Sequence, residues 1–249
     1  FQYGGAVMNT AELTSLAWPY VGLGGGIVLL ILLLFTDTCR SDLTKSRWRD
    51  PLWLSWMVAF VYLPHVFEEY GLHVLDGQFS LIAQFKEMGM DSRFGEIPTA
   101  FFPMINIFLT WIALPVAARL SKKNPVIGLS GMGFILINGM MHLGSCLVQR
   151  TNPYENFGSI TGIFFFLPLF FWILYVAIKG QMLPKKGLAI AIGSGVIAHL
   201  LVFALYVINL IAGHVVMLLC VPIVAFSSLT ISWLLCKAFK VELKEPIIE

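Results

Sequence analysis

The chain has 249 residues, of which 58% are hydrophobic and 12% charged, and its mean hydropathy is +0.82. Soluble domains carry about 25% charged residues, so this composition excludes an ordinary soluble protein and predicts an all-α, polytopic membrane protein. The net charge of +2 gives no reason to expect a nucleic-acid partner, because the basic residues fall in short loops between apolar segments. The lipid bilayer is the partner that composition predicts.

Seven segments are long and apolar enough to cross the hydrocarbon core, which requires roughly 20 residues each. We predict a single transmembrane helical domain over residues 8–249, and we interpret residues 1–7 as a vector-derived remnant with Met8 as the native start. The predicted spans are Trp18–Phe35, Leu52–Leu75, Thr99–Ala118, Pro125–Val148, Phe157–Ile178, Gly187–Asn209 and Gly213–Phe239.

Basic residues alternate between the two sides of these spans. Among the 16 Lys and Arg residues, all except Lys86, Arg93 and Arg150 fall in the loops after the first, third and fifth spans or at the C-terminal end. Since basic loops are retained on the inner side of a membrane, this pattern predicts an outer N-terminus and an inner C-terminus. Which membrane holds the protein, and its oligomeric state, stay open.

One long loop, residues 76–98, falls on the predicted outer side. Phe79, Ile82, Phe85 and Met88 recur in it at helical spacing, which is typical of an amphipathic helix that lies in the membrane interface. Such a helix serves either as a lid above a site or as a plain connector, and the pattern is compatible with both.

The second predicted span contains residues that are costly at depth. An acidic residue at the centre of a membrane helix costs at least about 2.5 kcal/mol, and this span holds Glu68 and Glu69 side by side. At 100° per residue, His65, Glu69 and His73 share one stripe of the helix, with Glu68 just beside it. Two adjacent acids with nearby histidines indicate a functional site.

Two other spans place polar residues at a similar depth. His65, Asn138 and His199 each lie about 12 to 14 residues from the inner end of their span, so at 1.5 Å per residue they are nearly level. His142 lies one turn above Asn138, at the depth of the two glutamates. Three helices are therefore expected to bring histidines, carboxylates and an amide into one layer.

Nitrogen and oxygen donors together suit zinc, iron or manganese, and we expect a divalent metal ion, zinc before the other two. One glutamate can bind metal while its neighbour acts as a general base, and an amide can hold a substrate oxygen. The predicted metal ligands are His65, Glu68, Glu69, His142 and His199. The predicted catalytic residues are Glu68, Glu69 and Asn138. No role is assigned to His73 and His214, which fall nearer the outer surface.

The five residues from His65 to Glu69 match the motif that names the HXXEE-domain membrane proteins, and the stretch from Asn138 to His142 resembles that family's later Asn-x-x-x-His segment. The resemblance covers roughly Leu52 to Pro168. It implies a membrane domain of poorly defined biochemistry that is suspected to be enzymatic or metal-binding. It also implies site roles for His65, Glu68, Glu69, Asn138 and His142, whereas His199 is included on its depth alone.

Three functions fit these residues. The first is a membrane-embedded, metal-dependent enzyme that acts on a lipophilic small molecule or lipid through metal-activated water. A hydrolytic reaction is favoured over an oxidative one, because the repeated His-x-x-x-His motifs of membrane desaturases are absent from the sequence. The second is a metal-free acid–base isomerase that uses the glutamate pair. The third is a proton-coupled transporter, although no internal repeat is visible.

Overall fold

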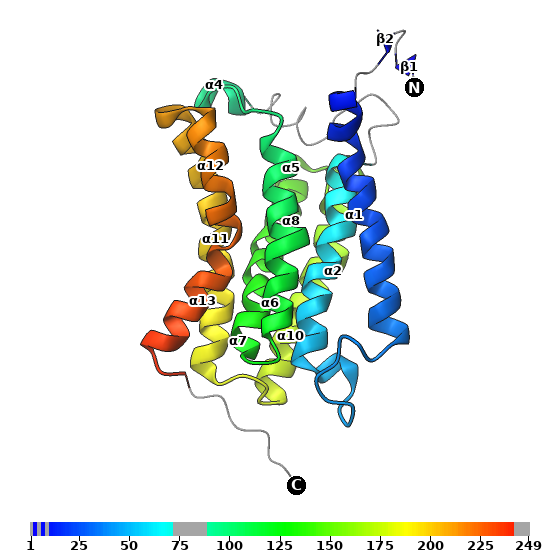
Figure 1. The fold of residues 1–249 in the computed structure, drawn as a ribbon, viewed down its shortest axis with the longest axis vertical. Coiled ribbons are helices and arrows are strands. Elements are labelled where there is room, and N and C mark those ends of the chain that lie inside the picture. Colours follow the sequence, from blue (N-terminus) through cyan, green and yellow to red (C-terminus); the bar gives the residue numbers. More distant parts are fainter. Residues whose placement is uncertain (1, 4–5, 8–9, 72–88, 242–249) are drawn as a thin grey trace.

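The computed structural model describes residues 2–3, 6–7, 10–71 and 89–241, and it is 81% helical. Its helices form one elongated bundle (Figure 1), which confirms the predicted all-α helical fold. Two short strands, β1 (Gln2–Tyr3) and β2 (Ala6–Val7), pair antiparallel ahead of the first helix.

Every predicted span lies largely on helix where the structure describes it, but the first two residues of the third and fifth spans and both end residues of the seventh are turn or coil. The helix of the second span is described as far as Tyr70. The last predicted residues of that span, 72–75, lie outside the described part of the chain, and so does the expected helix from Phe79 to Met88 in the long loop. Single helices form the first, second and sixth spans: α1 (Thr10–Phe35), α2 (Pro51–Tyr70) and α11 (Lys185–Ala212).

The other four predicted spans are each composed of consecutive helical segments. Among these segments, η3 and η6 are π-helical and η4 is 3₁₀-helical. The third and fourth comprise α5 (Phe101–Asn106), η3 (Ile107–Ala113), α6 (Leu114–Leu120), α7 (Pro125–Gly128), η4 (Leu129–Gly131) and α8 (Met132–Gln149). The fifth and seventh comprise α9 (Ser159–Thr161), η6 (Gly162–Phe166), α10 (Leu167–Lys179), α12 (His214–Ala225) and α13 (Ser227–Ala238). Outside the spans lie η1 (Arg47–Arg49), α4 (Met90–Phe94) and η5 (Pro153–Glu155).

Five helices in the described residues are long and apolar enough to cross a membrane, and a sixth crossing is formed if α12 and α13, which bend by 48°, count as one. The chain is therefore an integral membrane protein by the length and composition of its helices. α2 is not among the five, since its second half contains His65, Glu68 and Glu69. Seven crossings stay a prediction.

The loops after α1, α6 and α10 and the end of α13 lie toward the same end of the bundle, opposite the N-terminus (Figure 1). These are the segments rich in Lys and Arg, so the helix directions agree with the charge alternation in the sequence. The inside and outside assignment remains a prediction.

The start of α2 is fixed by a buried carboxylate. Asp50 accepts hydrogen bonds from the backbone N–H groups of Leu52 and Trp53 at 2.9 and 3.2 Å, and Pro51 occupies the first helical position. The same carboxylate accepts from the backbone of Ser41 and Asp42 in the preceding loop. One side chain thus caps the helix and holds the loop against it.

The core lies between α2, α8, η6 and α11, which contribute the fully buried side chains of Trp53, Phe134, Phe166 and Leu205. α8 and α11 approach most closely at two glycines. A Cβ atom added to Gly195 would lie 2.6 Å from the carbonyl oxygen of Ser130, and one added to Gly133 would collide with the backbone of α11. Only glycine permits this backbone contact.

Candidate metal and active site

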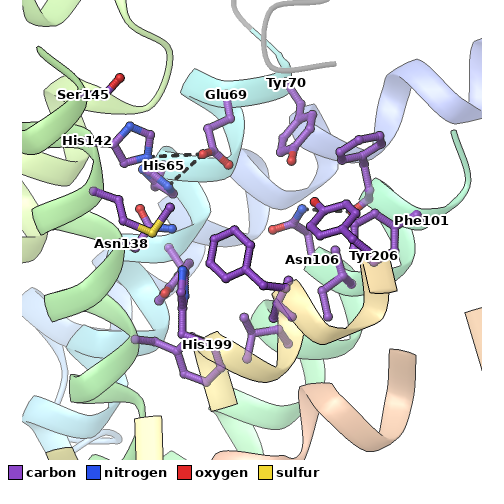
Figure 2. A pocket seen from close by; sticks show the side chains of 18 of the residues that line it. His65, Glu69, Tyr70, Phe101, Asn106, Asn138, His142, Ser145, His199 and Tyr206 are labelled. Carbon is purple, nitrogen blue, oxygen red and sulfur yellow. Dashed lines mark hydrogen bonds and ion pairs between the residues drawn. The ribbon is translucent and has the colours of Figure 1, made fainter. Parts of the chain in front are cut away.

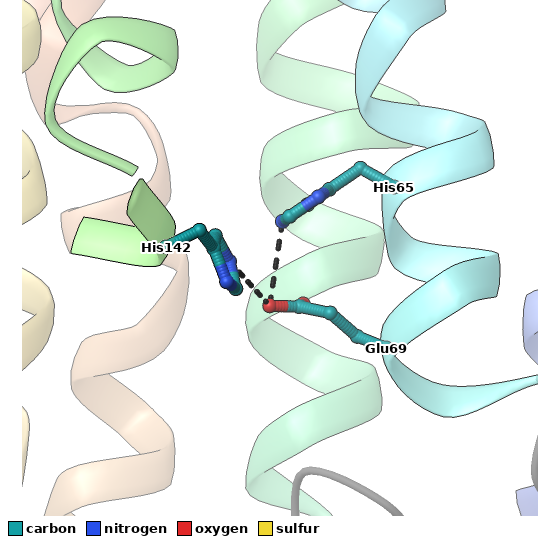
Figure 3. Close-up of side chains that lie close together, drawn as sticks. All are labelled: His65, Glu69 and His142. Carbon is teal, nitrogen blue, oxygen red and sulfur yellow. Dashed lines mark ion pairs between the residues drawn. The ribbon is translucent and has the colours of Figure 1, made fainter. Parts of the chain in front are cut away.

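The second half of α2 presents His65 and Glu69 on one face, one helical turn apart, and α8 brings His142 to them. Glu69 Oε1 lies 3.3 Å from His65 Nε2 and 3.4 Å from His142 Nε2 (Figure 3). One ligand atom from each residue lies within 4.8 Å of the others, and the side chains of His65 and Glu69 are buried. Two helices far apart in sequence therefore meet at one carboxylate oxygen.

These distances fit a small divalent ion. With metal–ligand bonds of about 2.0–2.2 Å, two ligands of a tetrahedral site lie about 3.3–3.6 Å from each other. Both contacts of Glu69 Oε1 fall at that spacing. Apart from its 3.3 Å contact with Glu69 Oε1, His65 Nε2 is buried and has no hydrogen-bond partner in the described residues. Two histidines and a glutamate form a donor set common in catalytic zinc sites, where the fourth position stays open for water or substrate.

Glu68 points elsewhere. Its carboxylate accepts hydrogen bonds from the backbone N–H groups of Ile160 and Thr161 at 2.9 and 2.8 Å, and also from the Thr161 hydroxyl. Adjacent residues on a helix are rotated by about 100°, so Glu68 faces the start of α9 while Glu69 faces α8. The structure thus places Glu68 outside the group of three possible ligands, at the N-terminus of another helix.

Glu68 is nevertheless connected to the group through Thr161. The Thr161 hydroxyl gives its single hydrogen to Glu68, so its oxygen accepts from His65 Nδ1, which lies 2.8 Å away. His65 then carries a proton on Nδ1 and directs Nε2 at Glu69. A lone pair facing a carboxylate oxygen is unfavourable, so the geometry calls for a cation between Nε2 and Glu69, either a proton or a metal ion.

The segment from Gly158 to Gly162 forms one wall of this site, and it was missed in the sequence. A Cβ atom on Gly158, whose φ is +80°, would lie 2.7 Å from His142 Cε1 and 2.8 Å from Glu69 Cγ. Ser159 Oγ lies 3.4 Å from His142 Nδ1. The available signal was two glycines enclosing Ser159 and Thr161 at the start of an otherwise apolar span.

The three residues lie at one end of a cavity of about 280 Å³ (Figure 2). Its walls are largely aromatic and aliphatic, and its opposite end contains Tyr70, Asn106 and Tyr206. Asn138 and His199 both line it, as their predicted depth requires, but neither belongs to the group of three ligands. The remaining lining residues are Tyr62, Phe101, Phe102, Ile105, Leu109, Phe134, Met141, Ser145, Asn156, Val202 and Phe203.

His199 packs among aromatic rings, with the centroids of Phe134 and Phe203 each 5.7 Å from its own. The role of His199 as a metal ligand and the role of Asn138 in catalysis stay predictions. Of the two histidines that had no assigned role, His214 is exposed at the start of α12, and His73 lies outside the described residues.

A family model described as "Protein of unknown function with HXXEE motif" matches residues 56–173. Residues 56–173 belong to the HXXEE family. The match confirms the resemblance drawn from the sequence, and it contains every residue of the three-ligand group together with Glu68, Asn138 and Thr161. The comparisons with curated proteins and with solved structures gave no match.

The HXXEE domain does not contain the whole cavity. Its match ends within α10, so the wall formed by α11, including His199 and Tyr206, lies outside it. Within the HXXEE domain, the motif residues divide between two tasks: the histidine and the second glutamate face the cavity end, and the first glutamate binds the start of α9.

Proposed function

We propose that this protein is a membrane-embedded, metal-dependent enzyme that acts on a lipophilic small molecule, most simply as a hydrolase. The observation that carries the proposal is the convergence of His65, Glu69 and His142 at the end of a largely apolar cavity, where both spacings between Glu69 and a histidine fit a tetrahedral ion. Zinc is the first choice of metal for this donor set, with iron and manganese as alternatives.

The chain's own residues take distinct parts in this proposal. His65, Glu69 and His142 hold the ion, and Thr161 with Glu68 fixes the ring of His65 so that Nε2 faces it. A bound zinc ion would supply Lewis acidity and a water molecule of lowered pKa. Asn138 positions a substrate oxygen from the cavity wall. His199, which also lines the cavity but does not hold the ion in this proposal, accepts a proton. The aromatic walls exclude bulk water.

A metal-free acid–base isomerase is the second candidate. It is favoured by the same short contacts, because a proton on His65 or His142 also satisfies Glu69 Oε1. In that case Glu69 and a protonated histidine exchange a proton with the substrate, and activity survives chelation. The two candidates differ in what lies between the histidines and Glu69.

Elemental analysis of the protein purified in mild detergent tests the proposal. We expect about one equivalent of metal in the wild type, as a three-ligand site would hold, and its loss in both Glu69→Gln and His142→Ala. His214→Ala is the matched control, since His214 is exposed and outside the cavity, and it should retain the metal. A wild type that stays metal-free after reconstitution with zinc, iron and manganese would contradict the proposal and favour the isomerase.

A further inference from the structure

One face of the cavity is not sealed by the described residues. Among its described lining residues, those on α2 and α5 are buried or half-buried, whereas Met141 on α8 and Phe203 on α11 are 46% and 38% exposed. These are the two exposed side chains of the described lining, and they belong to neighbouring helices. The exposed rim of the cavity therefore lies between α8 and α11.

The packing of these two helices explains the gap. Their backbones touch at Gly133 and Gly195, and the rim residues Met141 and Phe203 each follow the contact glycine of their own helix by eight residues. At 1.5 Å per residue, the rim lies about 12 Å along both helices from the point of contact. Packed helices generally cross at an angle, so they separate on moving away from their point of contact.

On its opposite side α8 is closed. A Cβ atom on Gly139 would lie 2.8 Å from the carbonyl oxygen of Gly162, so α8 and η6 pack backbone to backbone there. The rings of Phe134 and His199, whose centroids are 5.7 Å apart, pack against each other between the two contact glycines and the rim. The gap is therefore bounded on one side by α8, which is packed against η6. At its end toward Gly133 and Gly195 it is bounded by this pair of rings.

We propose that substrate enters the cavity sideways from the lipid, through the gap between α8 and α11 bounded by Met141 and Phe203. This lateral entry deepens the proposed function. Calling the ligand a substrate rests on that proposed function. Both rim side chains are apolar, and the exposed residues beside them on the two helices, Met140 and Leu200, are apolar as well. A ligand that crosses this rim does so from hydrocarbon.

The cavity also constrains the ligand. Its volume of about 280 Å³ lies near the lower end of the range for small-molecule sites, so it admits a small apolar molecule or the end of one chain, not an entire two-chain lipid. Tyr62 Oη and Asn138 Oδ1 are buried in its walls without a hydrogen-bond partner in the described residues. The ligand we propose is therefore an apolar molecule with a hydrogen-bonding group, such as a carbonyl or hydroxyl, directed at Tyr62 and Asn138.

Photolabelling of the full-length protein in nanodiscs tests the entry route. The probe is a short-chain alcohol that carries an alkyl diazirine and partitions into lipid, and labelled residues are mapped by peptide mass spectrometry. We expect label on Leu109, deep in the cavity wall, as well as on Leu200, which faces outward and serves as the internal reference.

A pair of matched variants places the entrance. In Met141→Trp/Phe203→Trp, overpacking at the rim should lower the labelling of Leu109 relative to Leu200 by about tenfold. The control, Leu147→Trp/Val207→Trp, adds the same bulk to exposed positions on the same helices that do not line the cavity, and it should leave the ratio unchanged.

Three results would overturn lateral entry: no label on Leu109 in the wild type, equal labelling of Leu109 in the rim and control variants, or equally strong labelling of Leu109 by a charged, water-soluble diazirine. Metal content is measured on the same samples. Metal-free protein that is labelled as expected would end the metal proposal and leave lateral entry standing, whereas metal-loaded protein with unlabelled Leu109 would do the reverse.

Discussion

Glu68 and Glu69 are neighbours in sequence with the same chemistry and nearly the same burial, yet they serve different parts of the molecule. Glu69 is placed between two histidines with one oxygen 3.3 and 3.4 Å from their ring nitrogens. Glu68 is surrounded by hydrogen-bond donors from the start of α9. The difference teaches that an acidic pair at depth need not be a pair of ligands, because one member can be satisfied by a helix N-terminus.

Among variants that leave all three ligands in place, the largest effect on metal affinity is expected from adding bulk next to Glu69. Gly158→Ala places a Cβ atom against both His142 and Glu69, at a φ of +80° that favours glycine, so it should displace the two side chains and lower metal affinity by at least about 100-fold. Competition with a chromophoric chelator measures the affinity.

Gly213→Ala is the control for backbone strain, since Gly213 also has a positive φ but a Cβ atom there meets nothing within 4 Å. It should bind metal as the wild type does. Equal affinity in both alanine variants would show that Gly158 does not shape the site.

A smaller effect is expected from breaking the connection between the two glutamates. Thr161→Val removes the hydroxyl that orients His65, and loss of such an indirect contact typically lowers metal affinity by about 10–100-fold. Thr161→Ser retains the hydroxyl and should restore the affinity. If valine and serine behave alike, the orientation of His65 by Thr161 plays no part.

Glu68→Gln should act on folding more than on metal. The N–H groups of Ile160 and Thr161 donate to different oxygens of the carboxylate. The amide therefore keeps an acceptor for one of them, sets its NH2 group against the other and loses the charge, which should destabilise the protein by about 1–3 kcal/mol. For a chain of this size that is roughly 2–12 °C in the apparent melting temperature in detergent. A variant with unchanged melting temperature would exclude the capping role.

The smallest effect on the site is expected from Asp50→Ala. Asp50 is also a buried carboxylate at a helix N-terminus, but it lies at the other end of α2 and contacts no cavity residue. Loss of such a cap costs about 0.5–2 kcal/mol, and metal affinity should not change. Weaker metal binding would mean that the comparison between capping and ligand carboxylates is too simple.

Much of this arrangement could be predicted from the sequence. Apolar runs of about 20 residues locate the helices because each must satisfy its backbone hydrogen bonds in lipid. The stripe of His65 and Glu69 follows from helical periodicity, and the meeting with His142 follows from equal depth along parallel spans. The two residues that the depth argument added, Asn138 and His199, do line the same cavity.

The rest depended on tertiary packing. Axial height gives no rotation of one helix about another, so depth could not separate His199, which packs against aromatic rings, from His142, which reaches Glu69. The different partners of the two glutamates depend on where α9 begins, and α9 is only three residues long. Gly158 matters through a positive φ and a contact with His142, neither of which leaves a periodic signal.

The comparison of Glu69→Gln with Glu68→Gln by zinc titration, on folded protein checked by size-exclusion chromatography, tests the central claim most directly. We expect Glu69→Gln to lose high-affinity zinc binding, because it removes a ligand oxygen, and Glu68→Gln to retain it within about 100-fold of the wild type. Loss of zinc binding in Glu68→Gln with retention in Glu69→Gln would contradict the account, because it would assign the metal to the carboxylate that caps α9.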